Sequence, residues 1–335
     1  MADIGYDMPC YHPLDSYQIG VRPNGKKLLK ILGNSRKLKI VDGKPKFVTY
    51  RQLVPQGQET ILLPCGQCIG CRLERSRQKA MRAVHEAQMH EDNCFITLTY
   101  DDEHLGNGSL NKEDFKNFMK RLREYYVPKC PYPPNTPERE EWLFKHGIRY
   151  MHCAEYGEAL GRPHHHACLF NFDFPDKKYW RKTKDGHAVY VSETLSKLWK
   201  NGIHEIGTLT FESAAYVARY ITKKVNGAMA DDHYGDLLPE FCTQSLKPGI
   251  GFSWYEKYKD TDVHAQDQVW MRGMHMKPPK YYMDKYELTN PEEYAKVKEE
   301  RKKQAKESPD NSRSRLAVRE KIKLQQVTQL QRSLK

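Results

Sequence analysis

The sequence of 335 residues contains no long apolar run. No stretch approaches the ~20 consecutive apolar residues that a membrane-spanning helix needs. Residues 1–7 lack the basic start and apolar core of a secretory signal peptide. These absences predict a protein of the cytoplasm, where the environment is reducing. The nine cysteines are therefore interpreted as thiols or metal ligands rather than as disulfide partners.

Acidic residues are also too few to balance the basic ones. The chain has 55 lysines and arginines against 43 aspartates and glutamates, a formal net charge of +12 and a pI of about 9.1. This balance favours nucleic acid or another polyanion as the partner. Residues 37–41 and 46–50 alternate around Asp42-Gly43, which predicts a basic β-hairpin. The hairpin is either a contact for a DNA backbone or a solvated surface.

Three cysteines, Cys65, Cys68 and Cys71, follow one another at three-residue intervals with glycines between them. This spacing predicts a structural zinc site, because the thiols converge easily on one ion. Such a site usually has four ligands, and Cys10 is the favoured fourth one, with His12 in reserve. Three unliganded thiols or an iron–sulfur cluster are the alternatives.

Residues 162–170 predict a β-strand, since a turn glycine and a proline precede three histidines and an apolar run. Successive side chains of a strand alternate between its faces. His164 and His166 are therefore expected on one face and His165 on the other. Two imidazoles so placed can share one metal ion, whereas the simpler alternative is a surface strand with spare histidines.

Residues 149–157 predict a second strand. A hairpin around Gly157 and Gly161 would bring Glu155 close to the two histidines, and Glu158, in the expected loop, is the less favoured substitute. Two neutral nitrogens and one carboxylate suit a divalent cation that keeps open positions for substrate oxygens.

Residues 213–224 predict a helix with Ser213 as its N-cap. Tyr216, Tyr220 and Lys223 fall at i, i+4 and i+7 and share one face. The alternative is a tyrosine pair packed in the core. A face that ends in lysine suits a phosphate better than a core.

Together these stretches resemble the HUH endonucleases that start rolling-circle DNA replication. The family's His-hydrophobic-His motif is met by His164 and His166, and its tyrosine–lysine motif by residues 220–223. The family's first motif, an apolar-threonine strand, looks like residues 95–100. The paired Tyr216 resembles the two-tyrosine branch found in initiators of small single-stranded DNA bacteriophages, the Microviridae. The likeness spans about residues 94–225, and His165 departs from it by filling a slot that is usually hydrophobic.

The resemblance implies an α+β fold, with a central antiparallel sheet of about four to five strands and flanking helices. We expect a basic N-terminal region with the cysteine cluster at residues 1–90, the endonuclease domain at 91–262, and a basic, partly helical extension at 263–335. The extension is expected to break between two helices at residues 308–311.

The resemblance also implies the roles of single residues. Tyr220 and Tyr216 would be the nucleophiles with Lys223 beside them, and His164, His166 and Glu155 would bind magnesium or manganese. Similar phage initiators carry an early cysteine with the same cluster, which supports zinc on Cys10, Cys65, Cys68 and Cys71. The remaining DNA contacts would come from Arg162, Arg219 and Lys224.

The implied activity is metal-dependent nicking of origin DNA by tyrosine transesterification, followed by strand rejoining. Expected partners are single-stranded and origin DNA and a host replication helicase, in the cytoplasm of a host bacterium. One alternative is a zinc-stapled, basic DNA-binding or packaging protein without catalysis. Another is a transposase or relaxase of the same superfamily.

Two further segments carry expectations of their own. Residues 111–126 predict an amphipathic helix whose buried stripe is Phe115, Phe118, Met119 and Leu122. Residues 277–282 mix basic and aromatic side chains, which suits either stacking of single-stranded DNA or an aromatic loop packed on the domain.

Overall fold

The computed structural model describes residues 10–23, 27–34, 38–41, 44–47, 50–157, 160–183, 186–219 and 229–329. The chain divides into two compact units. The smaller unit combines Met1–Glu74 with Glu292–Gln331, and the larger one combines Arg75–Pro291 with Arg332–Lys335. The smaller unit thus draws on both ends of the sequence, whereas the three segments predicted above are consecutive. Their boundaries stay a prediction.

The smaller unit contains a three-stranded antiparallel sheet in the order β2-β1-β5. Its strands are β1 (Leu14–Val21), β2 (Lys27–Asn34) and β5 (Ile61–Leu63). The predicted basic hairpin is confirmed, because β3 (Leu38–Val41) and β4 (Lys44–Phe47) pair antiparallel. The short 3-10 helix η1 (Tyr50–Leu53) follows it in the chain.

Two long C-terminal helices belong to the same unit. They are α9 (Pro291–Glu307) and α10 (Arg313–Gln329), with the short helix η4 (Pro309–Asn311) between them. Pro309 stops the first helix, as the sequence predicts, because proline cannot donate the hydrogen bond that would continue it. Leu316 of α10 is buried.

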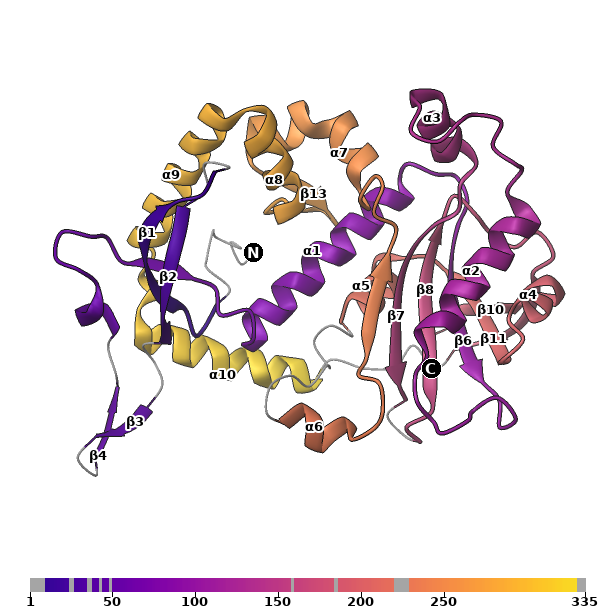
Figure 1. The fold of residues 1–335 in the computed structure, drawn as a ribbon, viewed down its shortest axis with the longest axis horizontal. Coiled ribbons are helices and arrows are strands. Elements are labelled where there is room, and N and C mark those ends of the chain that lie inside the picture. Colours follow the sequence, from indigo (N-terminus) through magenta and orange to yellow (C-terminus); the bar gives the residue numbers. More distant parts are fainter. Residues whose placement is uncertain are drawn as a thin grey trace. The chain divides into compact units, whose positions relative to one another are not determined.

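The larger unit is built on one antiparallel sheet of seven strands (Figure 1). Their order is β12-β7-β8-β6-β11-β10-β9, and every neighbouring pair is antiparallel. The strands are β6 (Asn93–Tyr100), β7 (Arg149–Tyr156), β8 (Pro163–Phe170), β9 (Lys178–Lys182), β10 (Ala188–Val191), β11 (Gly202–Thr208) and β12 (Phe241–Gln244). The predicted α+β class with a central antiparallel sheet is therefore confirmed. The sheet is wider than the four to five strands predicted, because the short strands β9, β10 and β12 extend both of its edges.

One face of the sheet packs against helices α2 (Lys112–Tyr126) and α4 (Glu193–Leu198) (Figure 1). The predicted stripe of α2, Phe115, Phe118, Met119 and Leu122, is buried there among Ile96, Leu98 and Leu169. Asn111 caps this helix by accepting a hydrogen bond from the Glu113 backbone N–H. Helix α3 (Pro137–His146) precedes β7 in the chain.

The opposite face carries the second core. Ala83 of α1 (Ile69–Ala87) and Ala214 and Val217 of α5 (Phe211–Arg219) pack there on residues of β6, β7 and β8. Alternation along each strand separates the two cores: on β8, Leu169 belongs to the first and Cys168 to the second.

The remaining elements of the larger unit follow α5 in the chain. They are α6 (Met229–Tyr234), α7 (Phe252–Tyr258), the π-helix η3 (Lys259–His264), β13 (Val269–Met271), β14 (Met274–Met276) and α8 (Lys280–Thr289). Tyr282 of α8 is buried, and its hydroxyl lies 2.9 Å from Nδ1 of His85 on α1. For this tyrosine the packed alternative of residues 277–282 is the right one. No helix of the described residues is long and apolar enough to cross a membrane.

Candidate active site

The predicted metal ligands meet in the middle of the large sheet. Glu155 of β7 pairs with His164 of β8, and His166 of β8 pairs with Thr97 of β6. Paired residues on adjacent strands point to the same face. Glu155, His164 and His166 therefore lie on the face that α1 and α5 cover, as the alternation along the strands predicts.

Three side chains from three elements form the centre of this site. His166 Nε2 lies 3.0 Å from Glu155 Oε1, and both side chains are almost wholly buried. The Tyr216 hydroxyl of α5 donates to the same Glu155 oxygen over 3.4 Å. The Tyr216 ring also stands edge-on to the His166 imidazole, with 5.0 Å between ring centroids. A phenol, an imidazole and a carboxylate thus share one contact point.

Thr97 holds the other side of the same imidazole, and sequence reasoning missed it. Its Oγ1 lies 3.0 Å from His166 Nδ1. A histidine that binds a metal through Nε2 carries its proton on Nδ1, and that N–H needs an acceptor. The Thr97 hydroxyl is such an acceptor. The signal in the sequence was the strand alternation of residues 95–100, which puts Thr97 and Thr99 on one face.

His164 occupies the space beside a loop glycine. A Cβ atom built on Gly157 would lie 2.8 Å from His164 Nε2, closer than real Cβ atoms approach, so the ring fits there only because residue 157 has no side chain. The His164 and His166 ring centroids are 6.2 Å apart. The donor set of two imidazoles and a carboxylate suits a divalent cation, although it is more open than the cysteine cluster described below.

His165 points to the opposite face and belongs to a buried hydrogen-bond chain. Its Nδ1 lies 3.0 Å from His152 Nε2, and its Nε2 lies 2.9 Å from the Tyr100 hydroxyl, which donates to Asp114. Burial lowers the pKa of His165 to about 3 and also lowers the pKa of His152 far below its ordinary value. Both rings are therefore neutral and structural at pH 7. His152 also went unnoticed in the sequence.

Helix α5 presents Tyr216 to the site, and it starts earlier than predicted. The helix begins at Phe211, so its N-cap is Thr210 and not Ser213. Thr210 Oγ1 accepts a hydrogen bond from the Ser213 backbone N–H, and Ser213 Oγ accepts one from the Thr210 N–H. This reciprocal pair is a capping box, in which Ser213 is the inner member.

The rest of the predicted tyrosine face lies beyond what the structure describes. Tyr220, Lys223 and Lys224 fall outside the described residues, and for Arg219 only the backbone is described. Glu158 also falls outside them.

Arg162 stands at the start of β8, where its guanidinium ties two strands together. It donates to the Tyr100 carbonyl over 2.9 Å and to Asp102 Oδ1 over 2.5 Å. Nearby, Asp101 Oδ1 accepts from the His104 backbone N–H and lies 2.7 Å from the His104 ring, as in a turn. The acidic residues after β6 thus serve the turn.

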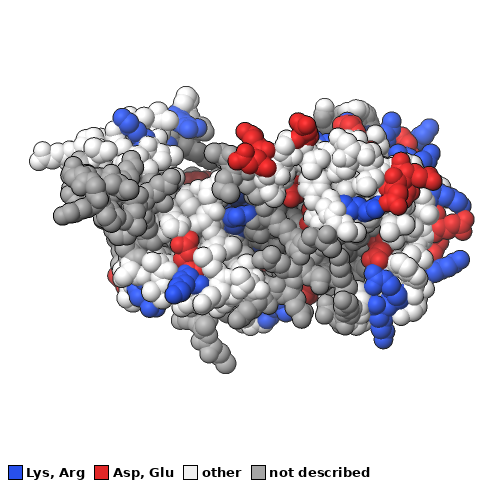
Figure 2. Space-filling view, turned by 90° about the horizontal axis from the view of Figure 1, so that it is seen from below, with Lys and Arg blue, Asp and Glu red and all other residues white. Residues whose placement is uncertain are grey.

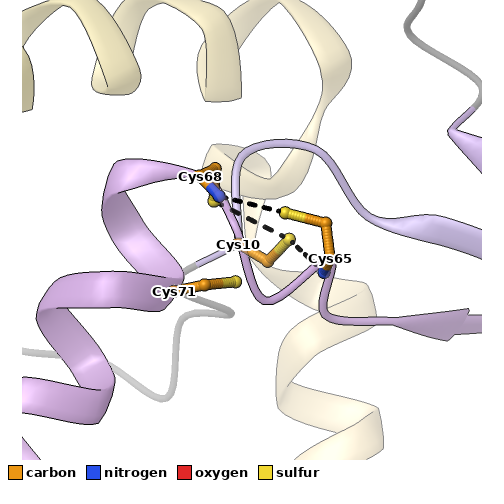
Figure 3. Close-up of side chains that lie close together, drawn as sticks. All are labelled: Cys10, Cys65, Cys68 and Cys71. Atoms are coloured by element: carbon orange, nitrogen blue, oxygen red, sulfur yellow. Dashed lines mark hydrogen bonds between the residues drawn. The ribbon is translucent and has the colours of Figure 1, made fainter. Parts of the chain in front are cut away.

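The four predicted zinc ligands gather in the smaller unit (Figure 3). The sulfur atoms of Cys10, Cys65, Cys68 and Cys71 all lie within 4.8 Å of one another. Among the described residues, no other group of three or more histidine, cysteine or acidic side chains is so tight. His12, the reserve ligand, pairs instead with Glu320 at 2.7 Å.

The dimensions of this cluster fit a tetrahedral metal ion. With metal–sulfur bonds of ~2.3 Å, a zinc tetrahedron has sulfur–sulfur edges of about 3.8 Å, and the Sγ atoms of Cys68 and Cys10 are 4.0 Å apart. Backbone N–H groups of Cys65 and Cys68 point at the sulfurs of Cys10 and Cys65. Hydrogen bonds from neighbouring thiols lower the pKa of Cys68. Such donors favour thiolate, the form in which cysteine binds metals.

Comparison with known proteins assigns the chain to a family. The model of the replication-associated protein ORF2 family matches residues 93–225, the stretch from β6 to just beyond α5. The chain is 41% identical to replication-associated protein VP4 of Bdellovibrio phage phiMH2K over 239 residues, which cover 70% of this chain and 72% of that protein. It belongs to the replication-associated proteins of small single-stranded DNA phages.

Two more members of this family match over most of the chain. Replication-associated protein ORF2 of Spiroplasma virus 4 is 34% identical over 256 residues, covering 73% of this chain and 74% of that protein. Replication-associated protein ORF4 of Chlamydia phage 1 is 29% identical over 229 residues, covering 66% and 53%. No solved structure matches the chain significantly. As a phage replication-associated protein, the chain has a role in the initiation of phage DNA replication.

Proposed function

We propose that this replication-associated protein starts rolling-circle replication by nicking origin DNA through tyrosine transesterification. The observation that carries the proposal is the cluster of Tyr216, Glu155 and His166, in which one carboxylate oxygen lies 3.4 Å from the phenol and 3.0 Å from the imidazole. A purely structural tyrosine has no need of a histidine and a carboxylate on an otherwise apolar face.

The chain supplies the nucleophile and the groups that orient it. The phenol loses its proton to solvent, its oxygen forms a bond to the phosphorus, and the bond from phosphorus to the 3′ oxygen breaks. The departing 3′ oxygen takes up a proton, and the strand is left as a 5′-phosphotyrosyl ester. Phenol titrates near ~10, so phenolate is itself a fair leaving group, and the ester can react again to rejoin a strand.

His164, His166 and Glu155 would hold the divalent cation of this reaction. When bound, magnesium or manganese polarises the scissile phosphate and offsets its charge. Histidine is an uncommon magnesium ligand, so manganese is expected to bind more tightly in vitro. Thr97 contributes by fixing the tautomer and the orientation of His166.

Two tyrosines would divide the cycle between them. Tyr220 is proposed for the first attack, since Lys223 stands at the Tyr-x-x-Lys spacing and would add positive charge at the phosphate. Tyr216 would attack the regenerated origin after one round. Arg162, Arg219 and Lys224 are proposed as further DNA contacts, and the cysteine cluster as a structural zinc site. A host helicase would open the duplex, in the bacterial cytoplasm.

The experiment that tests this function is adduct formation. The protein is incubated with manganese and a single-stranded oligonucleotide of the phage origin, and the modified tyrosine is mapped by mass spectrometry. We expect a covalent adduct on Tyr216 or Tyr220. His166→Ala should abolish the adduct while most DNA affinity remains, because affinity comes mainly from distributed basic charge.

Tyr125→Phe, on the exposed surface of α2, is the matched control. An adduct on a tyrosine outside residues 213–224 would refute the mechanism. DNA binding with no adduct in any metal would favour the non-catalytic alternative.

A further inference from the structure

The strand at one edge of the large sheet has an unusual composition. β9 reads Lys-Tyr-Trp-Arg-Lys, and Lys177 precedes it. Tyr179 is 58% exposed and Trp180 is 54% exposed. Aromatic side chains of this size are usually buried, and exposed ones mark binding surfaces.

A β-bulge turns Trp180 outward. In the pairing of β9 with β10, Arg181 faces Val189 and Tyr179 faces Tyr190, so Trp180 is the additional residue that the register skips. Bulges of this kind redirect a side chain. The Arg181 guanidinium lies 5.2 Å from the centroid of the Trp180 ring. The indole is thus held beside a cation while its surface stays open to solvent.

Protection of the sheet edge explains only part of this composition. Lysines and a bulge on an edge strand prevent pairing with other chains. An exposed tryptophan and tyrosine do the opposite, because they make the edge more adhesive. On the face shown in Figure 2, basic side chains stand among acidic ones and do not form one continuous field. A polyanion therefore needs particular contacts as well as net charge.

The same strand is linked to the candidate active site across the sheet. His166 pairs with Thr97, Thr97 pairs with Glu205 of β11, and the Glu205 carboxylate accepts a 2.6 Å hydrogen bond from Arg181. Arg181 therefore lies on the face that carries the site. Ile203, in the same row as Thr99, is 66% exposed, so this part of the face is open.

The distance across the sheet is short on the scale of DNA. Four strand spacings of ~4.8 Å separate β8 from β9, about 19 Å in all. At ~3.4 Å per stacked nucleotide, roughly six nucleotides of one strand span it.

We infer that β9 is a second contact site for single-stranded DNA, in which an unpaired base stacks on Trp180. Arg181 and the exposed Lys178 and Lys182 supply positive charge for the flanking phosphates. Unpaired bases are required, because a duplex hides the base faces in its own stack. The inference rests on the proposed function only in placing this strand next to the nick.

Equilibrium binding without divalent cations tests the site separately from catalysis. Trp180→Ala should weaken binding of a long unpaired oligonucleotide roughly 5- to 140-fold, the effect of one lost stacking contact. Trp180→Phe, which keeps an aromatic ring, should retain most of the affinity. Binding of an oligonucleotide too short to span the sheet should not change. Tyr125→Ala is the matched control, since Tyr125 is 66% exposed on α2, which packs on the other face.

Three outcomes would overturn the inference: equal affinity of Trp180→Ala and wild type, an equal loss in Trp180→Phe, or an equal loss with duplex DNA. A folding defect in Trp180→Ala would appear as weaker binding of the short oligonucleotide too. In that case, crosslinking of the wild-type protein to an iodouracil-substituted strand decides, and no crosslink at residues 178–182 refutes the site. If wild type fails to nick but these binding results hold, only the proposed catalysis falls.

Discussion

Replacing Thr97 with valine tests whether the hydroxyl beside His166 prepares that ring for a metal. Valine has nearly the same shape, so the packing of β6 between β8 and β11 should persist. The change removes the one oxygen that lies 3.0 Å from His166 Nδ1. Without it, the Nδ1–H of a metal-bound imidazole loses its acceptor in a half-buried position.

The expected size of the effect follows from that single contact. One hydrogen bond of this kind contributes about 0.5–1.5 kcal/mol, and loss of such a partner typically lowers metal affinity or activity about 10- to 100-fold. We expect manganese affinity to fall by that factor, with little change in thermal stability. Thr97→Ser, which keeps the oxygen, should restore most of the affinity.

Manganese binding can be followed by electron paramagnetic resonance, which counts the free ion, and adduct formation by single-turnover kinetics. If the hydroxyl acts through the metal, the rate of Thr97→Val should recover at high manganese. Wild-type manganese affinity in Thr97→Val, or a Thr97→Ser variant as weak as it, would refute the reasoning.

Three further outcomes are expected. Cys68→Ser should release about one zinc per chain and lower the thermal stability, because ligand binding and folding are linked in such clusters; elemental analysis that finds no metal in the wild type would contradict this. Tyr216→Phe should keep the fold and still form an adduct on Tyr220, whereas the double variant with Tyr220→Phe should bind DNA without forming one, as gel analysis would show. Burial lowers the pKa of His85 to about 3, so the unfolded chain takes up a proton below pH ~6.5 that the folded chain refuses, and stability falls as the pH drops. Between pH 6.5 and 5 this group costs roughly 2 kcal/mol; denaturant unfolding should show a smaller fall by that amount in His85→Gln, and equal pH slopes would count against the buried neutral ring.

The centre of the sheet was predictable because its signals are local. Alternation in residues 162–170 gives the face of each histidine, and the short loop before Pro163 forces β7 and β8 to pair antiparallel. The stripe of α2 follows from helical spacing in the same way. Each of these inferences needs only neighbours in the sequence.

Other features depend on partners that the sequence does not reveal. Thr97 meets His166 only because β6 lies beside β8, although 69 residues separate them. β9 carries polar and aromatic residues on both faces, so alternation gives it no signal. Ser213 was assigned as a cap because it precedes an apolar run, while the structure shows it paired with Thr210 inside the first turn.

The glycine at the end of the β7–β8 hairpin limits how this protein can vary among phages. Gly157 has no side chain to offer the reaction, yet a methyl group there would take the place of the His164 ring. Any lineage that acquires a side chain at this position must first move the histidine, and with it a proposed metal ligand. Positions 157 and 164 can therefore change only together. In a library of variants selected for replication, substitutions at the silent glycine should be as rare as those at the imidazole.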